Sequence, residues 1–423
     1  MINLSSLIKY KLSNGLQVIL YPDINFPLVS TNLWYKVGSA NEIPGKSGLA
    51  HLAEHLMFQG SLNVPKEAHF KYIEEAGGSL NGSTNKERTN YYETLPSNHL
   101  ELAFWLESDR MGYLLQALDD DKFNNQLSVV INERKERYDN EPYGKAGEII
   151  YSNIYSAAHP YFAPVIGWQD DLDNLTIDDA KEFIKTYYSP NNASLVVAGD
   201  FDLEETKTLI EKYFGNIPPA KNIPQIIFPS VSLTETKCIT HYDKVNLPKI
   251  YLAWITDPSY SDEDFALSLS SFILGNSRTK YLFKKLVYDK QVAVNISCSL
   301  NSYKNSGVFL ITATAHKDGN LDELKNLIFE EIEELKKNSF SQKELNRFIN
   351  LYTSHTLFSL QNLANIADNL NGYDFELGTP DGFDFEIEKF RSLTPEIVGR
   401  FTSECLSKPY IELRILPLEE NIL

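Results

Sequence analysis

The sequence predicts a protein of mixed helices and strands, built as two similar halves. Strand-like and helix-like segments alternate along the 423 residues. A proline-rich stretch at 217–236 has little hydrophobic periodicity and is typical of an interdomain linker. After it, residues 249–275 repeat the order of strand, polar loop and helix that residues 31–60 show. The sequence therefore predicts two domains, at 1–216 and 237–423.

The bulk composition is that of a globular protein with more than one hydrophobic core. Hydrophobic residues make up 43% and charged residues 23% of a chain that is too long for a single core. The formal charge of −18 argues against nucleic acid or anionic lipid as a partner. It is compatible with cationic peptides, although an acidic balance more often only maintains solubility. No apolar run is long enough to span a bilayer, so we expect no membrane segment.

The cysteines and the N-terminus bear on location. Cys238, Cys298 and Cys405 are widely spaced and form no C-x-x-C pair, which favours free thiols in a reducing compartment. Residues 1–9 lack a basic region followed by an apolar one, so no signal peptide is expected. Both observations favour the cytoplasm, or the periplasm if a leader was removed before residue 1.

The first half begins with strands and continues mainly as helices. Residues 8–21 predict a hairpin around Asn14-Gly15, and residues 29–37 predict a further strand. The later segments are, in order, a helix at 65–76, two strands within 80–94, helices at 100–115 and 119–140, mostly helix over 143–187, a buried strand at 192–199 and a helix at 203–214.

The second half carries the same kinds of segment without metal-ligating residue types on its first helix. A strand at 249–255 and a polar loop at 257–264 lead into a helix at 265–275 that contains no His, Cys, Asp or Glu. A strand is predicted at 308–315, and helical stretches are predicted at 321–337 and 341–371.

The strongest chemical signal is a run of good helix formers between Gly48 and Gly60. On a helix, His51, Glu54 and His55 share one face, opposite an apolar face made by Leu49, Leu52, Ala53, Leu56 and Met57. Two imidazoles one turn apart can bind a single Zn²⁺, and the neighbouring carboxylate can reach a water on that metal. The order H-x-x-E-H is the inverzincin signature. The alternative is a surface helix that carries two histidines by chance.

A second helix, predicted at 119–140, carries Glu133 far along the chain from His55. Apolar residues precede it in Val129-Val-Ile-Asn-Glu133, so partial burial of this carboxylate is expected. Gln126, two turns earlier, shares its face of the helix. A lone glutamate on an exposed helix is usually only solvated. The residues alone therefore leave the role of Glu133 open.

The polar strands predicted within 80–94 have two interpretations. A polar strand beside a cleft can pair with the backbone of an extended peptide. An ordinary solvated edge strand would have the same composition, which is rich in Thr, Asn and Tyr.

Several runs of sequence together resemble the pitrilysin family of zinc peptidases, which includes insulin-degrading enzyme and the mitochondrial processing peptidase. The runs are residues 51–61, 77–84 and 129–133, His159-Pro160, and residues 192–201. The resemblance implies an α+β fold of two tandem similar domains, each an antiparallel sheet with helices packed on one side. It also implies that two such pairs close like a clamshell around a chamber, with the second domain of this chain inactive.

The resemblance further implies roles for individual residues. Zn²⁺ would be held by His51, His55 and Glu133, and Glu54 would be the general base. The strand that binds extended peptides in the family matches Asn81, Gly82, Ser83 and Thr84. Glu136, about one turn after Glu133, remains an alternative ligand.

The chain departs from the family pattern in both halves. Where members that cleave peptides usually carry a second glutamate, this chain has Gln126, which can orient a neighbour but cannot act as a base. In the second half, the family's arginine and tyrosine, which help to hold the substrate, align with Val287 and Val294. Tyr288 is one residue out of register and does not replace them.

The sequence as a whole predicts a zinc endopeptidase that cleaves extended or unfolded peptides. Because Val287 and Val294 stand at the arginine and tyrosine positions, we expect a heterodimer with a similar chain that lacks H-x-x-E-H but supplies this pair. One alternative is a self-sufficient homodimeric peptidase. The other is a non-catalytic scaffold, like the core subunits of respiratory complexes that share this architecture.

Overall fold

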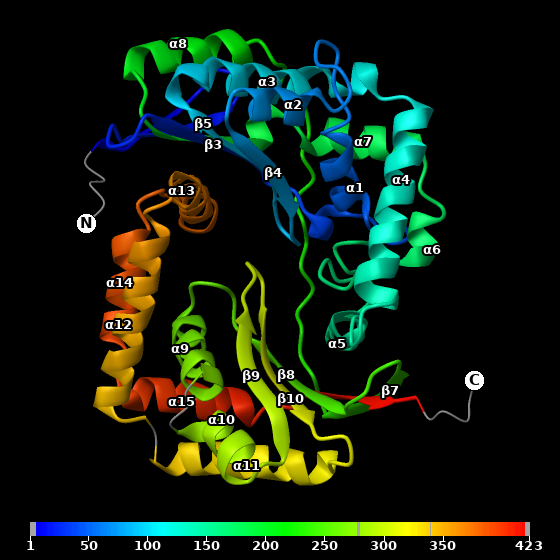
Figure 1. Ribbon diagram of the computed structural model, residues 1–423, viewed down its shortest axis with the longest axis vertical. Coiled ribbons are helices and arrows are strands. Elements are labelled where there is room, and N and C mark those ends of the chain that lie inside the picture. Colours follow the sequence, from blue (N-terminus) through cyan, green and yellow to red (C-terminus); the bar gives the residue numbers. More distant parts are fainter. Residues whose placement is uncertain (1–5, 277–279, 339, 419–423) are drawn as a thin grey trace. The chain divides into compact units, whose positions relative to one another are not determined.

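The computed structural model describes residues 6–276, 280–338 and 340–418, which form two compact units. Figure 1 shows two sheets, each with helices. This mixed architecture confirms the predicted α+β class. The first unit comprises Met1–Lys135, Ala163–Ile227 and Thr356–Phe383, and the second comprises Glu136–Phe162, Phe228–His355 and Asp384–Leu423.

The first unit is organised around a six-stranded sheet in the order β1-β2-β6-β3-β5-β4. Neighbouring strands are antiparallel except β2 and β6, which run parallel. The predicted hairpin is present, and Gly15 at its turn has φ +96°, a conformation that favours glycine. The strands are β1 (Ile8–Lys11), β2 (Gln17–Pro22), β3 (Leu28–Tyr35), β4 (Ser79–Thr84), β5 (Thr89–Pro96) and β6 (Ala193–Gly199).

Helices cover both faces of this sheet. Most of them come from the first half of the sequence: α1 (Leu49–Leu56), α2 (Ala68–Glu75), α3 (Leu100–Ala117), α4 (Asp120–Arg134), α6 (Gln169–Leu172), α7 (Ile177–Tyr187) and α8 (Leu203–Phe214). Figure 1 shows α3 and α8 on one side of the sheet and α13 (Leu363–Leu377) on the other. The α13 side chains Ile366 and Leu370 pack on Ile19 and Val196 of the sheet. Burial on both faces explains why β6 has no exposed residue.

The second unit repeats the strand order of the first. Its five-stranded sheet has the order β7-β11-β8-β10-β9, again with one parallel pair, β7 and β11, followed by antiparallel pairs. The strands are β7 (Lys237–Asp243), β8 (Lys249–Thr256), β9 (Ala293–Asn301), β10 (Gly307–Ala315) and β11 (Ile411–Pro417). The repetition that the sequence predicted is therefore present in the sheets.

The remaining helices lie in the second half, apart from one. They are α9 (Asp262–Asn276), α10 (Tyr281–Phe283), α11 (Leu321–Asn338), α12 (Gln342–Ser359), α14 (Phe383–Ser392) and α15 (Pro395–Leu406), together with α5 (Ala146–Ile154) from the first half. The helical stretch expected at 341–371 is divided into α12 and α13, because Asn362 caps α13 by accepting a hydrogen bond from the amide of Ala364. No helix within the described ranges has the length and apolarity to cross a bilayer.

Each compact unit contains a segment from the opposite half of the sequence. Residues 136–162, which include α5, belong to the second unit, and residues 356–383, which include α13, belong to the first. Residues 217–236 form neither helix nor strand. The division into related domains at 1–216 and 237–423 remains a prediction. The compact units differ from these two ranges because each unit includes one segment from the other range.

Candidate metal centre

The helix α1 carries the H-x-x-E-H motif and is anchored by its apolar face. Leu52 and Leu56 are fully buried, and Leu49, Ala53 and Met57 are at most 4% exposed. His51, Glu54 and His55 are on the opposite, half-buried face. The amphipathic pattern read from the sequence is confirmed.

The start of α1 is held by two unusual residues. Gly48, the N-cap, has φ +94°, and a Cβ there would lie 2.8 Å from the carbonyl oxygen of Ile166. Glu42 accepts a hydrogen bond of 2.8 Å from the amide of Ala50 in the first turn. Burial raises the pKa of Glu42 to about 8, against the lowering effects of the Ala50 and Gly48 amides and of Lys86. These contacts determine where the histidines stand relative to the rest of the unit.

The helix α4 brings Glu133 to α1. Asp119 caps its start by accepting from the amide of Lys122, and Arg134 at its end donates to the carbonyl of Gly167 at 2.7 Å. Between these anchors α4 packs against α1. The Glu133 side chain is 18% exposed, which confirms the expected partial burial.

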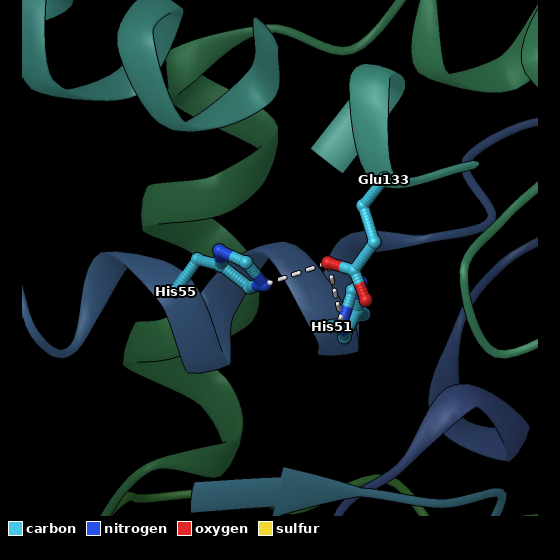
Figure 2. A group of neighbouring side chains, drawn as sticks. All are labelled: His51, His55 and Glu133. Atoms are coloured by element: carbon cyan, nitrogen blue, oxygen red, sulfur yellow. Dashed lines mark ion pairs between the residues drawn. The ribbon is translucent and has the colours of Figure 1, made fainter. Parts of the chain in front are cut away.

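Three side chains from the two helices converge on one point. Figure 2 shows the Glu133 carboxylate reaching toward the imidazoles of His51 and His55. Glu133 Oε2 is 3.4 Å from His55 Nε2 and 3.8 Å from His51 Nε2. One ligand atom from each residue lies within 4.8 Å of the others. Among the described residues, this is the group of His, Cys, Asp and Glu side chains able to hold a metal ion.

The donor set fits zinc. Two imidazole nitrogens and one carboxylate oxygen are the ligand types of catalytic zinc sites, in which three protein ligands leave a fourth position open. The spacing of the three atoms is wide enough for an ion to bind between them. Glu136 is exposed and does not belong to the group, so the geometry favours Glu133 over the alternative ligand.

Glu54 lies beside the cluster and is oriented by β4. The hydroxyl of Thr84 donates a hydrogen bond of 2.6 Å to Glu54 Oε2. Burial raises the pKa of Glu54, the Thr84 hydrogen bond and the charges of His55 and Arg88 lower it, and Glu133 raises it. A carboxyl group in such an environment is suited to accept and return a proton.

The strand β4 is the free edge of the first sheet. Within the described part of the chain it pairs with β5 alone, and α1 packs beside it. Asn81 is exposed, while Gly82, Ser83 and Thr84 are half-buried. At Gly82 a Cβ would lie 3.2 Å from the Phe58 ring. A side chain at this position would therefore be crowded on the side of β4 that faces α1. The edge position gives β4 unpaired backbone groups.

The other residues named from the sequence are distributed over both units. Gln126 is buried on α4, two turns before Glu133. In the second unit, Val287 packs on the hydrophobic core and Val294, on the edge strand β9, is 44% exposed. The roles of Glu42 as the anchor of α1 and of Thr84 as the partner of Glu54 were not predicted. Glu42 is a polar residue shortly before a helix, which is only a weak signal for an anchor. The contact between Thr84 and Glu54 depends on tertiary packing and has no local signal.

A paired α+β architecture with H-x-x-E-H on its first helix defines a class of metallopeptidases. Two family models match this chain in sequence. The model described as "Insulinase (Peptidase family M16)" matches residues 18–161, and the model described as "Peptidase M16 inactive domain" matches residues 174–352. The chain belongs to peptidase family M16, which confirms the resemblance read from its motifs.

Relatives from bacteria and plants carry peptidase names. "Zinc protease PqqE" of Helicobacter pylori is 30% identical over 366 residues, covering 84% of this chain and 80% of that protein. A probable mitochondrial-processing peptidase subunit beta of Arabidopsis thaliana is 24% identical, covering 85% of this chain and 68% of that protein. The crystal structure of a protease from Helicobacter pylori superposes with a TM-score of 0.92 at 27% identity, covering 97% of this chain and 99% of that one.

Proposed function

We propose that this chain is a zinc-dependent endopeptidase that cleaves extended or unfolded peptides. The observation that carries the proposal is the convergence of His51, His55 and Glu133 from two helices beside the carboxylate of Glu54. The name of the Helicobacter pylori relative as a zinc protease supports the choice of metal and of reaction.

The catalytic roles follow from the positions of the side chains. His51, His55 and Glu133 would hold Zn²⁺, which when bound lowers the pKa of a water molecule to about 7 and polarises a carbonyl group. Glu54 accepts a proton from the attacking water and returns it to the leaving amine. The hydroxyl of Thr84 holds the Glu54 carboxylate in place for both transfers.

The substrate is bound as an additional strand. The free edge of β4, with Asn81, Gly82, Ser83 and Thr84, offers backbone groups to an extended peptide next to Glu54. Pairing through the backbone fixes the register of the peptide and demands little of its sequence. A folded protein has its backbone groups already paired, so this mode of binding selects unfolded segments.

Removal of the metal tests the proposal directly. Treatment with a chelator is expected to abolish cleavage of an unstructured fluorogenic peptide, and one equivalent of Zn²⁺ is expected to restore it. Metal analysis should find about one zinc ion per chain before treatment. Magnesium serves as the control ion, because it prefers oxygen ligands and octahedral geometry. Full peptide cleavage by metal-free protein would contradict the proposal.

We further propose that full activity needs a partner subunit. Val287 and Val294 stand where the resemblance implies an arginine and a tyrosine, and neither valine side chain can donate a hydrogen bond to a substrate. A partner of related sequence, without H-x-x-E-H, would supply these donors in a heterodimer. The Arabidopsis relative is named as a subunit, which supports the idea of a paired assembly.

The partner is tested by assaying the purified chain alone and after mixing with the homologous chain co-purified from its native host. Peptide hydrolysis is expected to rise by at least about 100-fold in the mixture, since loss of one oxyanion donor alone costs about that factor. Equal activity of the chain alone would favour the self-sufficient homodimer. A chain that binds no zinc and cleaves nothing in either assay would favour the scaffold.

A further inference from the structure

Among the residues that the structure describes, β4 is paired with a strand on one side only, so its position depends on what lies against its two faces. Successive side chains of a strand point to opposite faces. Gly82 and Thr84 face α1, where Thr84 binds Glu54. Ser83 therefore faces the other side of the sheet, the side that carries α13. The contacts of Ser83 show how this second face is held.

Asn90 on β5 is the centre of the contacts beneath β4. It is 1% exposed, and each of its side-chain polar atoms is engaged. Asn90 Oδ1 accepts hydrogen bonds from Ser83 Oγ at 2.7 Å and from Arg88 Nη1 at 3.1 Å. Asn90 Nδ2 donates to Asp368 Oδ1 at 3.0 Å. The amide thus joins β4 to a residue of α13.

Asp368 is brought to the sheet by α13, a helix from the second half of the sequence. Besides Asn90, its Oδ1 accepts from Asn32 Nδ2 and Trp34 Nε1, each at 3.1 Å. Three donors on two strands therefore converge on one carboxylate oxygen. Such a network is strong when all of its members are paired, and it specifies one arrangement of the strands.

Arg88, in the turn between β4 and β5, completes the arrangement. Its Nη1 donates to the carbonyl oxygen of Ser83 at 2.8 Å and to the Ser83 hydroxyl at 2.5 Å. The guanidinium lies over the Trp34 ring, 5.2 Å from its centroid. Burial lowers the pKa of Arg88, while the charges of Asp368 and Glu54 raise it, so the cation lies within electrostatic reach of both carboxylates.

We propose that Arg88, Asn90 and Asp368 are positioning residues that hold β4 in the geometry needed to bind a peptide beside Glu54. The claim that these residues support peptide binding rests on the proposed function. The claim that they hold β4 in place rests on the contacts alone. Arg88 and Asn90 fix the backbone and side chain of Ser83, and Asp368 ties Asn90 to α13. The second half of the chain thereby contributes to the position of β4 through the Asp368 carboxylate.

Peptide affinity provides the first test. In a Glu54→Gln background, which binds without cleaving, R88A and D368N are expected to weaken binding of a fluorescent unstructured peptide by about 10- to 100-fold, the factor that corresponds to the loss of hydrogen bonds to a charged group. R88K, which keeps the charge and replaces the guanidinium by a single ammonium group, should recover part of the affinity. Zinc content should not change. Exposed Arg347→Ala and Asp381→Asn serve as matched controls and should bind like the parent.

Hydrogen exchange provides the second test, which does not depend on the proposed function. The amides of residues 79–84 are expected to exchange faster in R88A and D368N, while those of β3 and β6 keep their protection. Unchanged exchange in β4 with unchanged peptide affinity would overturn the proposal. General loss of protection with loss of zinc would also overturn it, because the residues would then support the whole fold. If the Glu54→Gln protein binds no peptide, the proposed function fails. Hydrogen exchange then still decides whether Arg88 and Asp368 hold β4 in place.

Discussion

Replacement of Glu54 by glutamine is expected to leave zinc bound and to reduce peptide hydrolysis by at least about 10²- to 10⁴-fold, the usual contribution of general acid–base catalysis. Glutamine has the shape of glutamate, and its carbonyl oxygen can still accept the hydrogen bond from Thr84. It has no site that takes up a proton near neutral pH. Because Glu54 is not among the three converging ligands, the metal should be unaffected.

The measurement compares kcat and KM for one peptide, with zinc content determined on the same samples. Loss of activity should be in kcat, since the free edge of β4 is unchanged and KM should remain similar. Glu136→Gln, the same change at an exposed position on the neighbouring segment, is the control. Residual hydrolysis above about one tenth of the wild-type rate would show that another group moves the proton.

Replacement of Glu133 by glutamine is expected to reduce zinc affinity by more than about 100-fold. Mutation of a residue that hydrogen-bonds a metal ligand lowers metal affinity by about 10- to 100-fold, and loss of a direct ligand lowers it further. The change removes the negative charge that lies within 4 Å of both imidazoles, and a neutral amide is a poor zinc ligand. Two histidines on one helix would then be left to hold the ion.

Competition with a chromogenic zinc chelator measures this affinity, and the melting temperature without metal reports on the fold. We expect the metal-free melting temperature to change by only a few degrees, because Glu133 is part-exposed and the end of α4 is held by Arg134. Glu136→Gln should bind zinc like the wild type. Wild-type affinity in Glu133→Gln would remove Glu133 from the ligand set and with it the main support for the proposed function.

The sequence predicted those residues of the site that lie close together along the chain. His51, Glu54 and His55 lie within two turns of one helix, so the helical period alone places them on one face. Glu133 required two distant helices to pack, and the residues by themselves left its role open. The contact of Thr84 with Glu54 and the contact of Asp368 with Asn90 depend entirely on tertiary packing.

The fold was predictable to a similar degree. Strands buried in the middle of the sheets, such as β6 and β8, were visible as apolar runs. The edge strands β7 and β9 were not predicted, because strands with one exposed side carry few apolar residues. β11 was also missed, although Ile411, Leu413 and Ile415 alternate with Glu412 and Arg414 as in a strand, because five alternating residues are a short signal. No local signal in the sequence shows that α13 packs on the first sheet.

The exchange of segments between the two halves has a consequence for biosynthesis. The first sheet lacks α13 until residue 377 has left the ribosome, so Ile19 and Val196 stay uncovered on the nascent chain until that point. Lys9 then pairs with Asp374, 365 residues away, a separation that makes closure slow. We therefore expect this protein to need protection from aggregation while it is being made, and to complete its folding only after translation has nearly ended.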